Sequence, residues 1–405
     1  MFTLLSILIG LITLFLNNHL LGRFFMFFTF FTFSCVLDGN FIGLWDDMYV
    51  YSKAINTPEV YVFWFGSALG YLGFCLCNHR SITYSIQYID YVPVQMLDVK
   101  RLAFFARLIA FISISAACIN TLKAGNISLM FLSPREWELA FGSNVFLNYL
   151  YFSHLSALIL LSVLIALKKA KFLDFSLLVL CLAISTLHGI KFTILHAFVF
   201  LSLALYTLNN NKIPKAVLLI GIIFTALIFS FFIFVRGGGA EGVLNYIISA
   251  SVNSIYIINK SSFVDYGNMG AIFPIDANLI EKVASRFSGE SHISRGVSAD
   301  TGFLLNNKYN LQSALTIISI TGPVGYVFIS CVLGLLIRAI PRKMSLFQMA
   351  FLVHLLNTLL MLFTTWEFYK FKLLFNLFLM FVLSGFIHHK ITFSLAKKNI
   401  LKMKV

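Results

Sequence analysis

The segment FLNYLYFSHLSALILLSVLIALKKAKFLDFSLLVLCLAISTLHGIK, residues 146–191, decides the fold class. Residues 146–167 contain no Asp, Glu, Lys or Arg, and residues 172–187 form a second apolar run. Between the two runs lie Lys168, Lys169 and Lys171. Since a helix needs about 20 apolar residues to cross the hydrocarbon of a bilayer, this pattern predicts two membrane spans joined by a short basic turn.

The composition of the whole chain agrees with this interpretation. Of 405 residues, 59% are apolar and 11% are charged, and the mean hydropathy is +0.89. Water-soluble domains have about 45–50% apolar and about 25% charged residues. The composition therefore excludes a soluble enzyme, a nucleic-acid-binding domain and a disordered chain. In a membrane protein the net charge of +14 reflects orientation and not a nucleic-acid partner.

Apolar runs long enough to be spans continue through the chain. They are residues 2–16, 24–37, 59–77, 102–119, 146–167, 172–187, 190–208, 214–235, 313–338, 345–365 and 371–388. We therefore expect an all-α, polytopic membrane bundle of about eleven transmembrane helices. The first run lacks a basic segment before it and a small-residue cleavage site after it, so we interpret it as a span and not as a signal peptide. The six cysteines lie in apolar runs, and we expect neither a disulfide nor a zinc site.

Lys and Arg in the short loops predict the orientation. The sets at 168–171, 212–215, 338–343 and 390–404 all fall on one side of the bundle if the C-terminus is cytoplasmic. The N-terminus and residues 236–312 are then exterior. The predicted division is an N-terminal bundle of eight spans (1–235), a large exterior loop (236–312), and three final spans with a basic tail (313–405).

The large exterior loop has the features of a functional element. It opens with Arg236 and three glycines, which give either a flexible exit from the membrane or a phosphate site where the backbone can approach a ligand. Apolar residues at helical spacing predict an amphipathic helix over residues 242–259, and Asp276 is a candidate N-cap for a second short helix.

A cluster of candidate site residues follows within the loop. Arg286 and Arg295 are typical phosphate ligands, and His292 and Asp300 are candidate general bases. A solvated loop with ordinary charges explains the same pattern. Glu367, in the last exterior turn, is a further candidate base.

Other residues carry weaker signals. Lys191 and His188 lie in a short exterior turn, where Lys191 is either a membrane-flanking residue or faces the large loop. Asp46 and the adjacent carboxylate are either solvated or form a base or metal site. The spans also contain Arg107, which lies near the cytoplasmic third and can extend its side chain to the cytoplasmic surface. Histidines 154, 196 and 354 are too dispersed in sequence to indicate a proton relay.

The layout resembles that of an O-antigen repeat-unit polymerase of the Wzy type. The features that match are the span count, the basic tail, the short exterior turn at His188–Lys191, and the large late loop with its three arginines. The resemblance covers the whole chain and rests on layout. The short turn carries Lys191 where the family typically has Arg.

The resemblance implies a glycosyltransferase of lipopolysaccharide biosynthesis with a GT-C-like fold. Such an enzyme lies in the bacterial inner membrane with its active site facing the periplasm, and it joins oligosaccharide repeat units carried on undecaprenyl pyrophosphate. Implied partners are that lipid-linked oligosaccharide, membrane lipid and a chain-length regulator protein, with no nucleic acid, cofactor or metal ion. Lys191, Arg236, Arg286 and Arg295 would bind the pyrophosphate. His292 would be the base, with Asp300, Glu367 and Asp46 as alternatives.

Three other functions remain open on the sequence. An O-antigen ligase uses similar chemistry with a different acceptor. A flippase or other transporter for the same lipid would typically show paired repeats and broken helices, which we do not find. A structural subunit of an envelope complex would tolerate alanine at every arginine of the loop.

Overall fold

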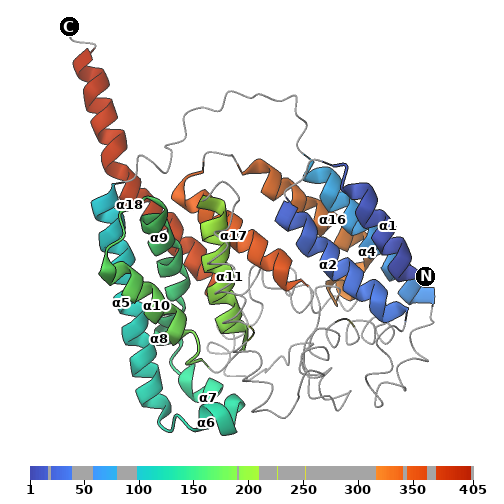
Figure 1. Ribbon diagram of the computed structural model, residues 1–405, viewed down its shortest axis with the longest axis horizontal. Helices are drawn as coiled ribbons and strands as arrows, with labels where there is room; N and C mark the ends of the chain where they lie inside the picture. The colour runs from blue at the N-terminus through green and yellow to red at the C-terminus, as the bar shows by residue number, and fades with distance from the viewer. Residues whose placement is uncertain are drawn as a thin grey trace, which may run out of the picture. The chain divides into compact units, whose positions relative to one another are not determined.

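A computed structural model describes residues 1–16, 20–38, 58–79, 98–188, 191–208, 226, 251, 316–340, 344–362 and 371–402. Every element in this part of the chain is a helix, which confirms the all-α prediction there (Figure 1). The helices are α1 (Phe2–Thr13), α2 (Leu20–Leu37), α4 (Pro58–Cys77), α5 (Val99–Ala124), α6 (Leu129–Leu132), α7 (Pro134–Phe141), α8 (Val145–Phe152), α9 (His154–Ala166), α10 (Phe172–Ile184), α11 (Lys191–Leu208), α16 (Thr316–Ala339), α17 (Leu346–Met361) and α18 (Phe371–Lys402).

Ten of the predicted apolar runs coincide with helices, and the run at 214–235 lies outside the described residues apart from Ala226. Within the described ranges, three helical segments are long and apolar enough to cross a membrane: Val60–Cys77, Val99–Ala124 and Val145–Ala166. Seven further apolar helices in the described part of the chain are shorter. These helices agree with a membrane protein. The count of eleven spans and the large loop at 236–312 stay predictions.

Two predicted runs differ from the helices observed. The run at 146–167 is divided into α8 and α9 at Ser153, whose hydroxyl donates back to the carbonyl oxygen of Leu150 (2.5 Å). The last run was predicted to end at residue 388, but α18 continues to Lys402. The first part of the basic tail is therefore helical.

The chain divides into two compact units, and each combines early and late segments. Unit 1 comprises residues 1–85, 237–340 and 358–371, and unit 2 comprises residues 86–236, 341–357 and 372–405. The predicted division at residues 235 and 312 followed the expected membrane loop, which lies almost wholly outside the described residues.

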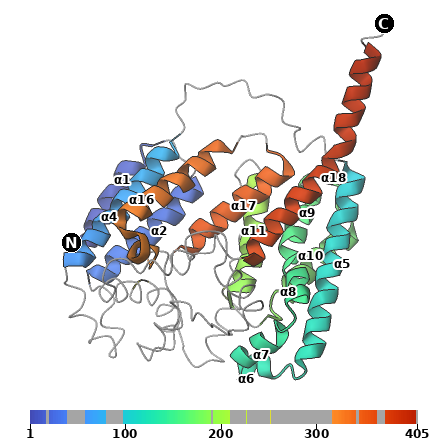
Figure 2. The same cartoon turned by 180° about the vertical axis from the view of Figure 1, so that it is seen from behind.

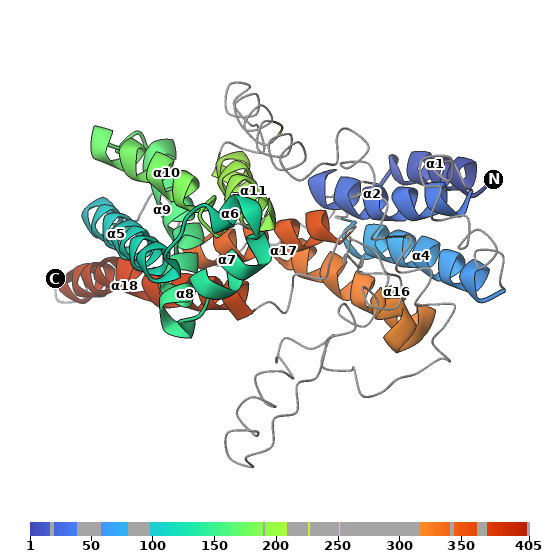
Figure 3. The same ribbon diagram turned by 90° about the horizontal axis from the view of Figure 1, so that it is seen from below.

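Unit 1 contains α1, α2, α4 and α16, and α4 and α16 lie side by side in it (Figures 1 and 3). Glycines permit this close packing. A Cβ atom added at Gly70 would lie 2.6 Å from the ring of Tyr326, and one at Gly334 would lie 2.7 Å from the carbonyl oxygen of Phe74. Small residues at such crossings let helix backbones approach each other in membrane proteins.

Unit 2 contains α5 to α11, α18 and residues 346–357 of α17. Helix α9 is its centre, because residues 154–164 are all buried and α9 contacts α5, α10 and α11. Asn376 joins α18 to α9, since its Oδ1 accepts hydrogen bonds from the backbone nitrogen (3.1 Å) and the hydroxyl (2.6 Å) of Ser156. Figures 1 and 2 show α6 and α7 at one end of this unit and the final part of α18 extending from the opposite end.

Candidate functional site at one end of unit 2

The structure places only one of the predicted site residues. Lys191 is the first residue of α11, where its backbone is described. Arg236, Arg286, Arg295, His292, Asp300, Glu367 and Asp46 lie outside the described residues. Their assigned roles stay predictions.

Helix α7 covers the end of unit 2 that is formed by the start of α9 and the residues after α10. It begins with Pro134 at a first-turn position, and it presents Trp137 and Phe141, four residues apart, on one buried face. The Trp137 indole Nε1 donates to the carbonyl oxygen of Leu187 (2.6 Å). This bond attaches α7 to the turn that carries His188. Figure 3 shows α6 and α7 across this end of the unit.

His188 is buried among aromatic rings. It is 1% exposed, and its ring stacks on Tyr151 with centroids 5.7 Å apart and planes at 14°. The rings of Phe141 and Phe152 meet it edge-on at 5.5 Å and 5.3 Å. Neither ring nitrogen of His188 has a hydrogen-bond partner in the described part of the chain. Buried polar groups in native proteins are nearly always paired, so this exception requires an explanation.

His154 also contacts Tyr151, with ring centroids 5.0 Å apart and planes at 45°. Its Nδ1 donates to the carbonyl oxygen of Tyr151 (2.7 Å). Because a carbonyl only accepts, this bond assigns the ring proton to Nδ1 and leaves Nε2 as an acceptor. Among the described residues nothing donates to that Nε2.

Lys372 brings a positive charge to this group. Its Nζ lies 4.4 Å from the centroid of the Phe152 ring. The side-chain amide of Asn376 fixes the local backbone, since it donates to the carbonyl oxygens of Phe152 (3.1 Å) and Lys372 (2.9 Å). We name His154, His188, Tyr151, Phe152 and Lys372 the His188 cluster.

The charge state of His188 follows from this environment. Burial, followed by the positive charge of Lys372 and then the proximity of His154, lowers the pKa of His188 to about 3. The imidazole is therefore neutral near pH 7 and offers a lone pair that can accept a hydrogen bond or a proton. A negative charge placed beside His188 would raise its proton affinity.

The residues that the structure describes include no group of three metal-ligating side chains, and the cluster itself offers two histidines and a cation. The arrangement suits an anionic or hydroxyl-bearing ligand. The predicted orientation places this end of unit 2 at the exterior face of the membrane, next to Lys191.

The opposite end of unit 2 contains an ion pair in which the carboxylate is buried and the guanidinium is partly buried. The Arg107 Nε and Nη2 donate to the two carboxylate oxygens of Asp174 (2.7 and 3.0 Å), a partner that the sequence did not predict. Asp174 also accepts from the backbone nitrogen of Lys171 (2.7 Å), which caps α10. Every polar group of this carboxylate is satisfied, which is typical of a structural pair.

The neighbours of His188 were not predicted from the sequence. Histidines 154, 196 and 354 were interpreted as too dispersed for a proton relay, and His188 was placed separately in an exterior turn. The fold brings His154 and His188 to the same two aromatic rings. One signal could have found them. The predicted orientation puts three ends of apolar runs on the exterior side of the membrane: the start of 146–167, the end of 172–187 and the start of 371–388. Near these ends lie His154, His188 and Lys372.

Comparison of the chain with protein-family models, curated proteins and solved structures finds no match.

Proposed function

We propose that this protein is a surface-polysaccharide polymerase of the O-antigen kind. In this proposal it is a glycosyltransferase of the bacterial inner membrane that joins repeat units carried on undecaprenyl pyrophosphate at the periplasmic face. The whole-chain layout suggests the family. The observation in the structure that supports it most is the His188 cluster, where an unpaired buried imidazole lies beside the cation Lys372 at the predicted exterior end.

The reaction requires two kinds of side chain. The hydroxyl oxygen of the acceptor sugar attacks the anomeric carbon of the donor, the bond from that carbon to the phosphate oxygen breaks, and the lipid pyrophosphate leaves with the electron pair. Cations must stabilise the charge on this leaving group, and a base must receive the hydroxyl proton. A buried and unpaired neutral imidazole can accept a hydrogen bond or a proton from a hydroxyl group, but it is not a cation.

The predicted loop residues would supply most of these groups. Arg236, Arg286, Arg295 and Lys191 are the proposed pyrophosphate ligands, and His292 is the proposed base, with Asp300 and Glu367 as alternatives. Lys191 begins α11 three residues after His188. Because of this proximity, we add Lys372 to the proposed cations and His188 to the groups that contact the acceptor. The proposed chain-length regulator would act beside this machinery.

Deletion of the gene and complementation in the native host test the proposal, with surface polysaccharide read as a ladder on a gel. The wild-type gene should restore long chains, while Arg236→Ala and Arg295→Ala, at normal expression, should leave single repeat units. Long chains with either variant would show that the arginine is not essential. The deletion phenotype separates the alternatives, because a flippase mutant exposes no repeat units and a ligase mutant accumulates unattached polymer.

A further inference from the structure

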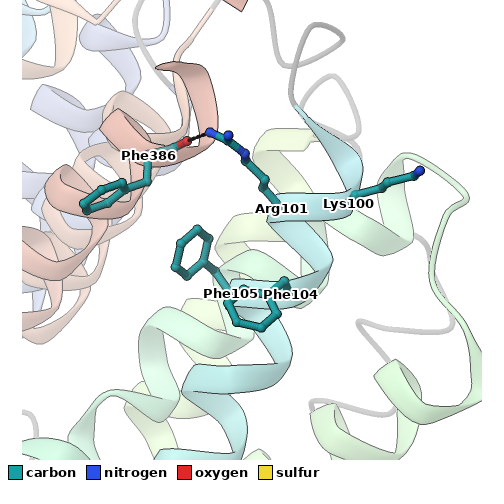
Figure 4. Close-up of a pocket in the computed structure, with 5 residues that line it drawn as sticks. All are labelled: Lys100, Arg101, Phe104, Phe105 and Phe386. Atoms are coloured by element: carbon teal, nitrogen blue, oxygen red, sulfur yellow. Dashed lines mark hydrogen bonds between the residues drawn. The ribbon is translucent and has the colours of Figure 1, made fainter. Parts of the chain in front are cut away.

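A second site lies at the end of unit 2 opposite the His188 cluster. Lys100, Arg101, Phe104 and Phe105 at the start of α5 line a surface pocket of about 440 Å³ together with Phe386 of α18 (Figure 4). We name it the Arg101 pocket. It does not overlap the His188 cluster, and the predicted orientation places it at the cytoplasmic surface of the membrane.

The polar wall of the pocket is Arg101. Its Nη1 donates to the carbonyl oxygen of Phe386 (3.0 Å), and its Nε lies 3.5 Å from a carboxylate oxygen of Asp98. These contacts hold the guanidinium between α5 and α18, and its Nη2 group has no partner within the described part of the chain. Asp98 is itself engaged, because it accepts from the backbone nitrogens of Lys100 and Arg101 as the N-cap of α5. The side chain of Lys100 extends away from Arg101 on the other flank of the helix (Figure 4).

The apolar wall lies beside this guanidinium. The ring centroids of Phe104 and Phe105 are 5.4 Å apart. The ring centroid of Phe105 on α5 lies 6.2 Å from that of Phe386 on α18. Phe104 is 60% exposed and Phe386 is 56% exposed. A cation with unused donors above exposed aromatic rings matches a molecule with an anionic head and an apolar body.

We propose that the Arg101 pocket binds one anionic phospholipid of the cytoplasmic leaflet. The phosphate accepts from the Nη2 group of Arg101, whose planar donors suit phosphate oxygens. The acyl chains lie along Phe104 and Phe386. Basic pockets between membrane helices on the cytoplasmic side recognise lipid headgroups in this way.

The purified full-length protein in zwitterionic detergent tests the proposal. Titration with short-chain phosphatidylglycerol, followed by native mass spectrometry, should show one tightly bound lipid, and phosphatidylcholine should bind at least about tenfold more weakly, in line with loss of a charge-assisted contact. Inorganic phosphate in a third titration should not compete, because it lacks the apolar body. Equal binding of the two lipids, or full competition by phosphate, would overturn the proposal.

Variants then locate the site. Arg101→Gln should weaken phosphatidylglycerol binding about tenfold, and Arg101→Lys should have a smaller effect because the charge remains. Lys123→Gln, in the last turn of the same helix, is the matched control and should bind as wild type. If Arg101→Gln does not fold, Phe104→Ala on the apolar wall replaces it and should also weaken binding. Wild-type binding by a folded Arg101→Gln or Phe104→Ala variant would contradict the site.

Discussion

Buried titratable side chains lie at both ends of unit 2, but their hydrogen-bond partners differ. At one end Arg107 and Asp174 form a two-bond ion pair, and the carboxylate also caps α10. At the other end His188 is equally enclosed, and neither of its ring nitrogens has a partner among the described residues. The ion pair of Arg107 and Asp174 needs no ligand to account for it, because its carboxylate oxygens are already bonded within the protein. The histidine costs free energy in the fold, and a ligand that pairs with it would account for its presence.

The largest expected effect of a single change on stability is at the ion pair. Asp174→Asn leaves the Arg107 guanidinium partly buried without a counter-charge, and we expect it to lower the free energy of unfolding by about 3 kcal/mol. Thermal unfolding of the purified protein in detergent measures this. The double variant Arg107→Gln, Asp174→Asn is the control and should lose less than the sum of the two single changes. Strictly additive losses would show that the two side chains are not coupled.

Asn376 should give the next largest effect. Its side chain bonds to Ser156, to the Phe152 carbonyl and to the Lys372 carbonyl, so Asn376→Leu leaves several buried groups unpaired. We expect a loss of about 2–3 kcal/mol in unfolding free energy. Ser176→Ala in α10 is the matched control, since that hydroxyl is exposed and bonds only to its own helix. Similar unfolding midpoints for both variants would contradict the central position of Asn376.

Part of the pH dependence of stability should come from His188. Its pKa is about 3 in the folded chain and about 6.5 in an unfolded one. Between these values the unfolded chain binds the extra proton, so stability falls as the pH falls, by on the order of 2 kcal/mol from pH 7 to pH 5. His154 and Lys372 face His188 and remain in the variant His188→Phe, which should show a clearly smaller fall. An identical pH profile for wild type and His188→Phe would show that His188 does not titrate as described.

The sequence predicted the positions of the helices but not their pairings. Apolar runs fix where a helix lies along the chain, because the bilayer demands a minimum length of apolar helix. They do not fix which side of each helix faces its neighbours. Two contacts join residues that are far apart in sequence, so only the fold reveals them. They are the ion pair of Arg107 with Asp174 and the shared packing of His154 and His188 on Tyr151. The packing of α4 on α16 did have a sequence signal, since Gly66 and Gly70 form a small-residue pair at a spacing of four, typical of close helix contacts.

The most direct test of the account is His188→Phe, assayed both for stability and for polysaccharide. The phenyl ring of this variant fits among the aromatic side chains and has no unpaired nitrogens. At pH 8 the free energy of unfolding should therefore change by less than about 1.5 kcal/mol. In the complemented deletion strain the same variant, expressed normally, should leave single repeat units and no long chains. Long chains at the wild-type level from this folded variant would contradict the claim that the His188 cluster is part of the site.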